Sequence, residues 1–275
     1  MQNAKCKNPY EELYIYYLQG RLNAERIAWE NFIGNWEEEG FSFLFFSKPA
    51  ENEVNALLSA HPELILTDQF CMSYEEWQGT RLSSFRAGSF VIYPPWEIPE
   101  IQGYQIPIIS DPGVVFGTGT HPTTRDCLYF IEQVCKDRLI ESALDLGCGT
   151  GLLALAAAKA GCGKVIAADF NFLAAKTTGN NIVLNGLENQ VIAVQADAKE
   201  IIAYPAELVI ANIHYAVMKE LISVRAFFEK EFFILSGLLR SEAKDIAVKL
   251  AQGKARIIET REHEGVWHTF FGTTT

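Results

Sequence analysis

Three glycines and two carboxylates near the middle of the chain could together hold a nucleotide-like ligand. The glycines are Gly147, Gly149 and Gly151, Asp145 precedes them, and Asp169 follows Gly147 by 22 residues. Glycine lets a backbone approach a ligand without a Cβ in the way, and it tolerates positive φ. A carboxylate at the end of the next strand, such as Asp169, can accept hydrogen bonds from both ribose hydroxyls. The spacing therefore predicts a site for an adenosine-containing molecule.

Dinucleotide-binding proteins also have a glycine-rich turn followed by an acidic residue. Their fingerprint requires Gly-x-Gly-x-x-Gly, and its third glycine would fall on Leu152 here. The glycines instead run Gly-x-Gly-x-Gly, which is typical of S-adenosylmethionine sites. Because no pyrophosphate has to be held, Asp145 can lie near the turn and attract a cationic ligand. We predict S-adenosylmethionine as cofactor and methyl transfer as the reaction. The alternative is a small-residue turn that only lets helix and strand pack closely.

The segments around the turn predict how it is held in place. Strands are expected at residues 142–146, 164–168, 191–195, 208–211 and 232–235, and helices at residues 152–159, 172–184 and 241–252. This alternation indicates a parallel sheet with helices on both faces. Residues 256–260 and 266–271 should add an antiparallel pair at the sheet edge. A seven-stranded α/β sheet with a final reversed hairpin is the architecture of class I methyltransferases, so residues 113–275 are predicted to be the cofactor-binding catalytic domain.

Residues 1–70 predict a smaller α+β domain without a catalytic constellation of its own. Strands are expected at residues 13–18 and 41–46, extended segments at 64–66 and 71–74, and helices at 23–36 and 51–59. One face of the first helix would carry Trp29, Phe32, Ile33 and Trp36. Five of the ten prolines then fall between Pro94 and Pro112. Such a stretch should be neither regular helix nor central strand, so residues 71–112 are predicted to be a stiff connecting segment.

Charge and composition restrict the partners and the compartment. The net charge is -11, and residues 1–100 alone carry 15 acidic and 7 basic side chains. A nucleic-acid-binding surface is normally basic, so direct nucleic-acid binding is not expected. The acidic surplus serves either solubility or the binding of a basic protein. No apolar run is long enough to span a membrane and no signal peptide is evident, which predicts a cytoplasmic protein. The six cysteines form no Cys-x-x-Cys pair, so neither a metal site nor a disulfide framework is expected.

One longer segment is similar to a known family. The run from Asp111 to Thr124, DPGVVFGTGTHPTT, resembles the signature of the ribosomal protein L11 methyltransferases. Further stretches follow in the order of that family, namely Trp77, Pro95-Trp96-Glu97, the glycine turn, Asp169 and Ala211-Asn212-Ile213. The resemblance covers residues 75–275, and the first 70 residues match only in their α+β pattern. It implies methyl transfer to amino groups of ribosomal protein L11, on lysine side chains and possibly the N-terminus, with a small ferredoxin-like domain that holds this substrate.

The resemblance also implies roles for particular residues. Thr124, Gly147, Asp169 and Asn212 fall where the family binds S-adenosylmethionine. The Thr124 hydroxyl could bind the methionine end of the cofactor. Asp197 follows the third strand and could reach the adenine amino group, or it could be an ordinary helix cap.

The predicted reaction is an in-line displacement by an amine on the sulfonium methyl carbon. A lysine has a pKa of about 10.4 in water, so it must lose a proton before it attacks. We expect the Asn212 side-chain oxygen and the Ile213 carbonyl to accept hydrogen bonds from the amine. Much of the acceleration would then come from holding the amine and the methyl group in line.

The Asn212 loop departs from the family, since His214 and Tyr215 follow where small or apolar residues are expected. The four residues from Asn212 to Tyr215 resemble the Asn-Pro-Pro-Tyr loop of methyltransferases that act on planar amines, in which the aromatic ring stacks on the substrate. His214 is then either a general base or a solvent-facing residue, and His121 is expected to hold the signature loop closed. The alternatives are methylation of another protein, a planar amine or a small molecule, and cofactor binding without chemistry.

Overall fold

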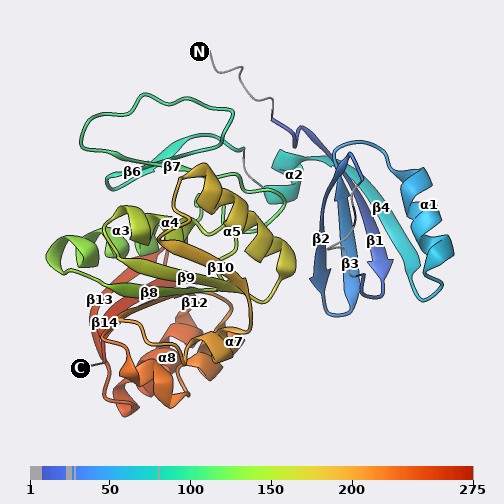
Figure 1. Cartoon of the computed structure of the whole chain (residues 1–275). Helices are drawn as coiled ribbons and strands as arrows, with labels where there is room; N and C mark the ends of the chain where they lie inside the picture. The colour runs from blue at the N-terminus through green and yellow to red at the C-terminus, as the bar shows by residue number, and fades with distance from the viewer. Residues whose placement is uncertain (1–7, 23–26, 28, 80, 275) are drawn as a thin grey trace. The chain divides into compact units, whose positions relative to one another are not determined.

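Figure 1 shows the chain as a computed structural model, which describes residues 8–22, 27, 29–79 and 81–274. The chain divides into two compact units, residues 1–83 and 84–275. Within the described ranges, none of the helices has the length and apolar character needed to cross a membrane.

The first unit is an antiparallel four-stranded sheet with helices. Its elements are β1 (Glu12–Gln19), β2 (Phe32–Glu38), β3 (Phe41–Phe46), α1 (Glu51–Ala60), β4 (Ile65–Ser73) and α2 (Tyr74–Gln78). The strand order is β2-β3-β1-β4, and each neighbouring pair is antiparallel. This is the strand arrangement of ferredoxin-like domains. Val54 and Leu57 of α1 pack on Leu18 and Leu44 in the core of the sheet.

The helix predicted for residues 23–36 is wrong over its second half. Phe32, Ile33 and Trp36 belong to strand β2, whereas residues 23–26 and 28 lie outside the described residues. Aromatic residues at a spacing of three and four fit a helical face, but they also favour strands. Cross-strand pairing decides here, because Trp36 lies opposite Phe43 of β3. The two extended segments predicted after α1 are parts of the single strand β4, which continues past the expected domain boundary at residue 70, and Tyr74 already begins α2.

The second unit contains the predicted seven-stranded sheet. Its strands are β8 (Ser142–Leu146), β9 (Lys164–Asp169), β10 (Val191–Gln195), β11 (Leu208–Asn212), β12 (Phe232–Leu239), β13 (Arg256–His263) and β14 (Trp267–Thr273). The order is β10-β9-β8-β11-β12-β14-β13, parallel from β10 to β12, with β14 antiparallel to both of its neighbours. The prediction of a parallel sheet with a reversed hairpin at its edge is confirmed.

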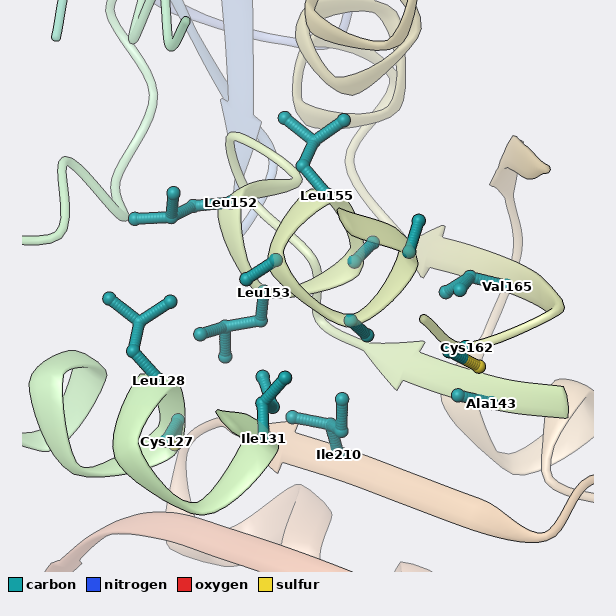
Figure 2. Close-up of a cluster of buried hydrophobic side chains, with 14 of the residues drawn as sticks. Cys127, Leu128, Ile131, Ala143, Leu152, Leu153, Leu155, Cys162, Val165 and Ile210 are labelled. Carbon is teal, nitrogen blue, oxygen red and sulfur yellow. The ribbon is translucent and has the colours of Figure 1, made fainter. Parts of the chain in front are cut away.

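Helices cover both faces of this sheet (Figure 1). They are α3 (Pro122–Asp137), α4 (Leu152–Lys159), α5 (Phe172–Leu184), α6 (Ala198–Ile201), α7 (Tyr215–Leu221), the 3₁₀ helix η2 (Arg225–Glu229) and α8 (Arg240–Gln252). One apolar cluster joins α3, α4 and α5 to one face, and a second joins α6, α7 and α8 to the other. Figure 2 shows Ile131 of α3 beside Ile210 of β11, and Leu128 of α3 and Leu153 of α4 belong to the same cluster. This packing fixes the start of α3 against the carboxyl end of the sheet.

The predicted connector is wrong in part, because it contains a third sheet. Strands β5 (Phe85–Ala87), β6 (Phe90–Tyr93) and β7 (Ile106–Ile109) form this sheet in sequence order. Phe90 and Ile108 are buried in the same cluster as α3 and α4, so the segment belongs to the catalytic unit. Pro107 is compatible with β7 because β7 is an edge strand, where a missing N–H donor costs no ladder bond on the open side.

Candidate functional site

The glycine turn connects β8 to α4 through three left-handed residues. Gly147, Gly149 and Gly151 have φ of 71°, 55° and 78°. A Cβ at Gly147 would lie 2.2 Å from the Ile213 side chain, and one at Gly149 would lie 2.6 Å from the Phe116 carbonyl oxygen. These approaches are between atoms of the protein itself, so the turn needs glycine for its own conformation and packing. The turn also supplies the Gly149 N–H that Asp169 accepts, and we call the turn together with Asp169 the cradle predicted for the cofactor.

The signature loop from Asp111 to Thr124 is fastened to this turn. Thr150 Oγ1 donates to the Gly117 carbonyl at 2.8 Å. Asn181 of α5 is fully buried, and its Nδ2 donates to the carbonyls of Asp111 at 2.8 Å and Thr150 at 2.9 Å. Its Oδ1 also accepts the Asp111 N–H at 2.8 Å. The sequence analysis missed Asn181, although a polar residue on the buried face of a predicted helix is an informative signal.

Asp169 ends β9 beside the turn, as predicted. Its Oδ2 accepts the Gly149 N–H at 3.0 Å, and its Oδ1 accepts the Asn171 N–H at 2.9 Å. Burial raises the pKa of Asp169, and these two backbone hydrogen bonds oppose that rise. Each carboxylate oxygen has a second lone pair. The carboxylate can therefore brace the turn and still accept hydrogen bonds from a ribose.

Asp145 is almost completely buried, and its Oδ2 accepts the Ala154 N–H of α4 at 2.9 Å. Burial raises the pKa of Asp145 to about 7, and the nearby Asp169 contributes to the rise. At neutral pH the carboxyl is thus only partly ionised. Its predicted attraction for a cationic ligand is correspondingly reduced, and the contact that the structure shows is a structural one with α4.

This burial predicts a pH-dependent effect of Asp145→Asn on stability. The folded protein binds the Asp145 proton more tightly than the unfolded chain does, so the wild type loses stability as pH rises from the ordinary value of 3.8 to about 7. Asparagine keeps an acceptor for Ala154 and has no charge to bury. As pH rises through that range, the free energy of unfolding of the variant should increase relative to that of the wild type by up to about 1.4 kcal/mol per pH unit. Urea unfolding at pH 5 and pH 8 measures this, and an equal difference at both pH values would contradict the assignment.

Asn212 lies at the end of β11, and α3 presents two threonines to its side chain. Asn212 Nδ2 donates to Thr123 Oγ1 at 3.4 Å and to Thr124 Oγ1 at 3.3 Å. Both amide hydrogens are therefore used on the α3 side, which leaves Oδ1 directed elsewhere. Because Thr124 Oγ1 accepts this bond, its own hydrogen remains available for the carboxylate of the cofactor.

Gly237, which the sequence analysis did not identify, lies beside that oxygen. It interrupts the pairing of β12 with β14 and has φ of 85°. A Cβ at Gly237 would lie 3.0 Å from Asn212 Oδ1 and 3.1 Å from the Ile213 carbonyl oxygen. The two oxygens predicted to accept the substrate amine thus lie close to the same point beside Gly237, where a side chain would crowd both of them. An isolated glycine in a strand is the signal that could have identified it.

Of the other two residues of the Asn212 loop, one is exposed and the other is bonded to α8. His214 caps α7, is exposed, and makes no side-chain hydrogen bond to the N-terminal turn of that helix. Tyr215 begins α7, packs on the cluster of the α8 face and donates its hydroxyl to Asp245 Oδ2 at 2.8 Å. The structure therefore ties Tyr215 to α8 through its hydroxyl.

This geometry predicts the effect of Tyr215→Phe. Phenylalanine keeps the packing and removes only the hydrogen bond to Asp245, so the variant should lose a little stability with unchanged kcat. Thermal unfolding and a methylation assay measure the two quantities. A large loss of kcat without a loss of stability would indicate that Tyr215 contacts the substrate.

Two further predicted residues have local roles in the structure. Asp197 caps α6, with Oδ1 accepting the Lys199 N–H at 2.9 Å, and a contact with adenine stays a prediction.

His121 caps α3, and its Nδ1 lies 2.7 Å from Thr123 Oγ1. Its ring contacts the Trp267 ring edge to face, with 4.9 Å between the ring centroids. These hydrogen bonds are local to the start of α3, and the expectation that His121 holds the signature loop closed stays a prediction.

Comparisons with known proteins agree with this geometry. The model of the ribosomal protein L11 methyltransferase family (PrmA) matches residues 60–275. Ribosomal protein L11 methyltransferases from Thermoanaerobacter sp. and Prochlorococcus marinus are each 36% identical to this chain, over 181 and 211 residues. These matches cover 65% and 71% of the chain, and they span 57% and 68% of the relatives.

A solved structure also matches. The ribosomal protein L11 methylase from Lactobacillus delbrueckii subsp. bulgaricus superposes with a TM-score of 0.63 and 24% identity, over 70% of this chain and 98% of that one. This likeness shows the fold. The family match covers more than half of the chain and includes the glycine turn, the signature loop and the Asn212 loop. The chain therefore belongs to the ribosomal protein L11 methyltransferase family.

Proposed function

We propose that this protein transfers methyl groups from S-adenosylmethionine to amino groups of ribosomal protein L11. The observation that supports this most directly is that two oxygens, Asn212 Oδ1 and the Ile213 carbonyl, both lie close to one point beside Gly237. The Ile213 side chain also lies against the glycine turn at Gly147. An acceptor pair for an amine is thus placed next to the cradle proposed for the cofactor.

The residues of the cradle fit S-adenosylmethionine. Asp169 would hold the ribose, and the Thr124 hydroxyl would bind the methionine carboxylate. When bound, the cofactor supplies a methyl group that its sulfonium already activates. The protein then has to orient a neutral amine and exclude water from it. Asn212 Oδ1 and the Ile213 carbonyl would accept the two hydrogens of that amine and point its lone pair in one direction.

A protein substrate accounts for the first unit better than a small molecule does. That unit is a folded sheet domain of its own, and residues 1–83 carry 13 acidic against 6 basic side chains. Ribosomal proteins that contact RNA are basic, so an acidic domain attracts them through long-range charge. On this account KM for the protein substrate rises with salt, because at 0.1 M ionic strength charges more than about 10 Å apart are largely screened from each other.

The experiment is methylation of purified ribosomal protein L11 by the full chain with S-adenosylmethionine labelled in the methyl group. Label should enter L11, and acetylation of the L11 amines beforehand should abolish its incorporation. A second candidate is a planar amine, which the resemblance of the Asn212 loop suggests. Label in free planar amines without label in L11 would overturn the proposed substrate and favour that candidate.

A further inference from the structure

The orientation of the Asn212 amide depends on which atoms around it hold hydrogens. Thr123 Oγ1 lies between the Asn212 amide, at 3.4 Å, and His121 Nδ1, at 2.7 Å. Its hydroxyl has one hydrogen to donate. If that hydrogen pointed at Asn212, the amide could present its oxygen to Thr123. If it points at His121, only the amide nitrogen can face Thr123.

The hydrogen bonds of His121 indicate which way the Thr123 hydrogen points. Its Nδ1 accepts the backbone N–H of Thr123 as the cap of α3, at 3.4 Å, so Nδ1 carries a lone pair on this side. In that tautomer the Thr123 hydroxyl is a second donor that shares the Nδ1 lone pair, and Oγ1 is left to accept from Asn212 Nδ2. The edge-to-face contact with Trp267 supports the imidazole from the other side. Although the ring is exposed, its Nδ1 contacts Thr123 in the first turn of α3.

We propose that His121 is a positioning residue, which acts through the Thr123 hydroxyl to turn the Asn212 amide oxygen toward the methyl-accepting amine. The inference rests on the proposed role of Asn212 Oδ1 as the amine acceptor. Without His121, the Thr123 hydrogen is free to rotate toward Asn212. The amide then samples both orientations, and in one of them a donor faces the space beside Gly237, where an acceptor is needed.

Substitutions at the two relay positions test this in the full-length protein. Thr123→Val keeps the shape of the side chain and removes the hydroxyl, and His121→Ala removes the acceptor of its hydrogen. Each should lower kcat roughly 3- to 10-fold, the effect of one neutral hydrogen bond, with little change in cofactor affinity. His121→Asn places an amide oxygen near the position of Nδ1 and should recover most of the rate lost in His121→Ala. Because all three residues act as one unit, Thr123→Val should have no further effect in an Asn212→Ala background.

A second measurement does not depend on the substrate. The side-chain amide signal of Asn212 in a nitrogen-15 NMR spectrum, assigned by its loss in Asn212→Ala, should shift in Thr123→Val and in His121→Ala and return in His121→Asn. An unmoved signal, or an equal kinetic effect of Thr123→Val with and without Asn212, would overturn the relay. A wild-type protein that fails to methylate L11 while the amide signal shifts as expected would instead reject the proposed function and leave the positioning role established.

Discussion

Replacing Asn212 by alanine should lower kcat for L11 methylation by roughly 10²- to 10³-fold, the loss typical of removing one preorganised polar group from a reacting centre. The reason is geometric, because Oδ1 and the Ile213 carbonyl oxygen lie close together beside Gly237, where both can accept from one amine. An interaction that orients the attacking amine is made in the transition state, so its loss appears in kcat. Affinity for S-adenosylhomocysteine, measured by calorimetry, should fall much less.

His214→Ala is the matched control for this variant, since it changes the same loop at an exposed side chain. The control should keep a rate close to wild type. If His214 were the general base, the control would instead lose kcat as strongly as Asn212→Ala does. Equal losses of kcat and of cofactor affinity in Asn212→Ala would show that Asn212 mainly holds the cofactor.

The fold of the catalytic unit could be predicted because its signals are local. The strand at residues 191–195 and the helix at residues 172–184 were predicted with the bounds that β10 and α5 have. Continuous apolar strands that alternate with helices leave few arrangements other than a parallel sheet. The helix predicted at residues 23–36 failed for the opposite reason. Phe32 and Trp36 could lie on one face of a helix or belong to a strand. Pairing with β3, which lies later in the sequence, decides for the strand.

The candidate site could be predicted in part for a related reason. Gly147, Asp169 and Asn212 stand at the ends of strands, where the sequence order of a parallel sheet already brings residues together. The residues that orient them could not be found in this way. Thr123 and Asn181 reach the site from helices, over separations of 89 residues to Asn212 and 70 residues to Asp111. Only the packing of α3 and α5 on one face of the sheet sets these contacts.

Asp169→Ala should weaken the binding of S-adenosylhomocysteine by roughly 2 to 4 kcal/mol, because hydrogen bonds to a charged group contribute about 1.5 to 3 kcal/mol each and do not simply add. The carboxylate also accepts the N–H groups of Gly149 and Asn171. Its removal therefore disturbs the turn as well as the ribose contact. Calorimetric titration of the variant measures the sum of the two effects, and a second variant has to separate them.

Asn171→Ala separates the two effects, because it changes the same turn and leaves the carboxylate in place. Asn171 Oδ1 caps α5 by accepting the Leu173 N–H at 2.9 Å, and losing such a cap costs about 1 kcal/mol of stability. The Asn171 N–H that Asp169 accepts belongs to the backbone and survives the substitution. This control should therefore lose stability and keep most of its cofactor affinity. If both variants lost affinity equally, the shape of the turn would be the cause, and if Asp169→Ala bound normally, the ribose would be held by another residue.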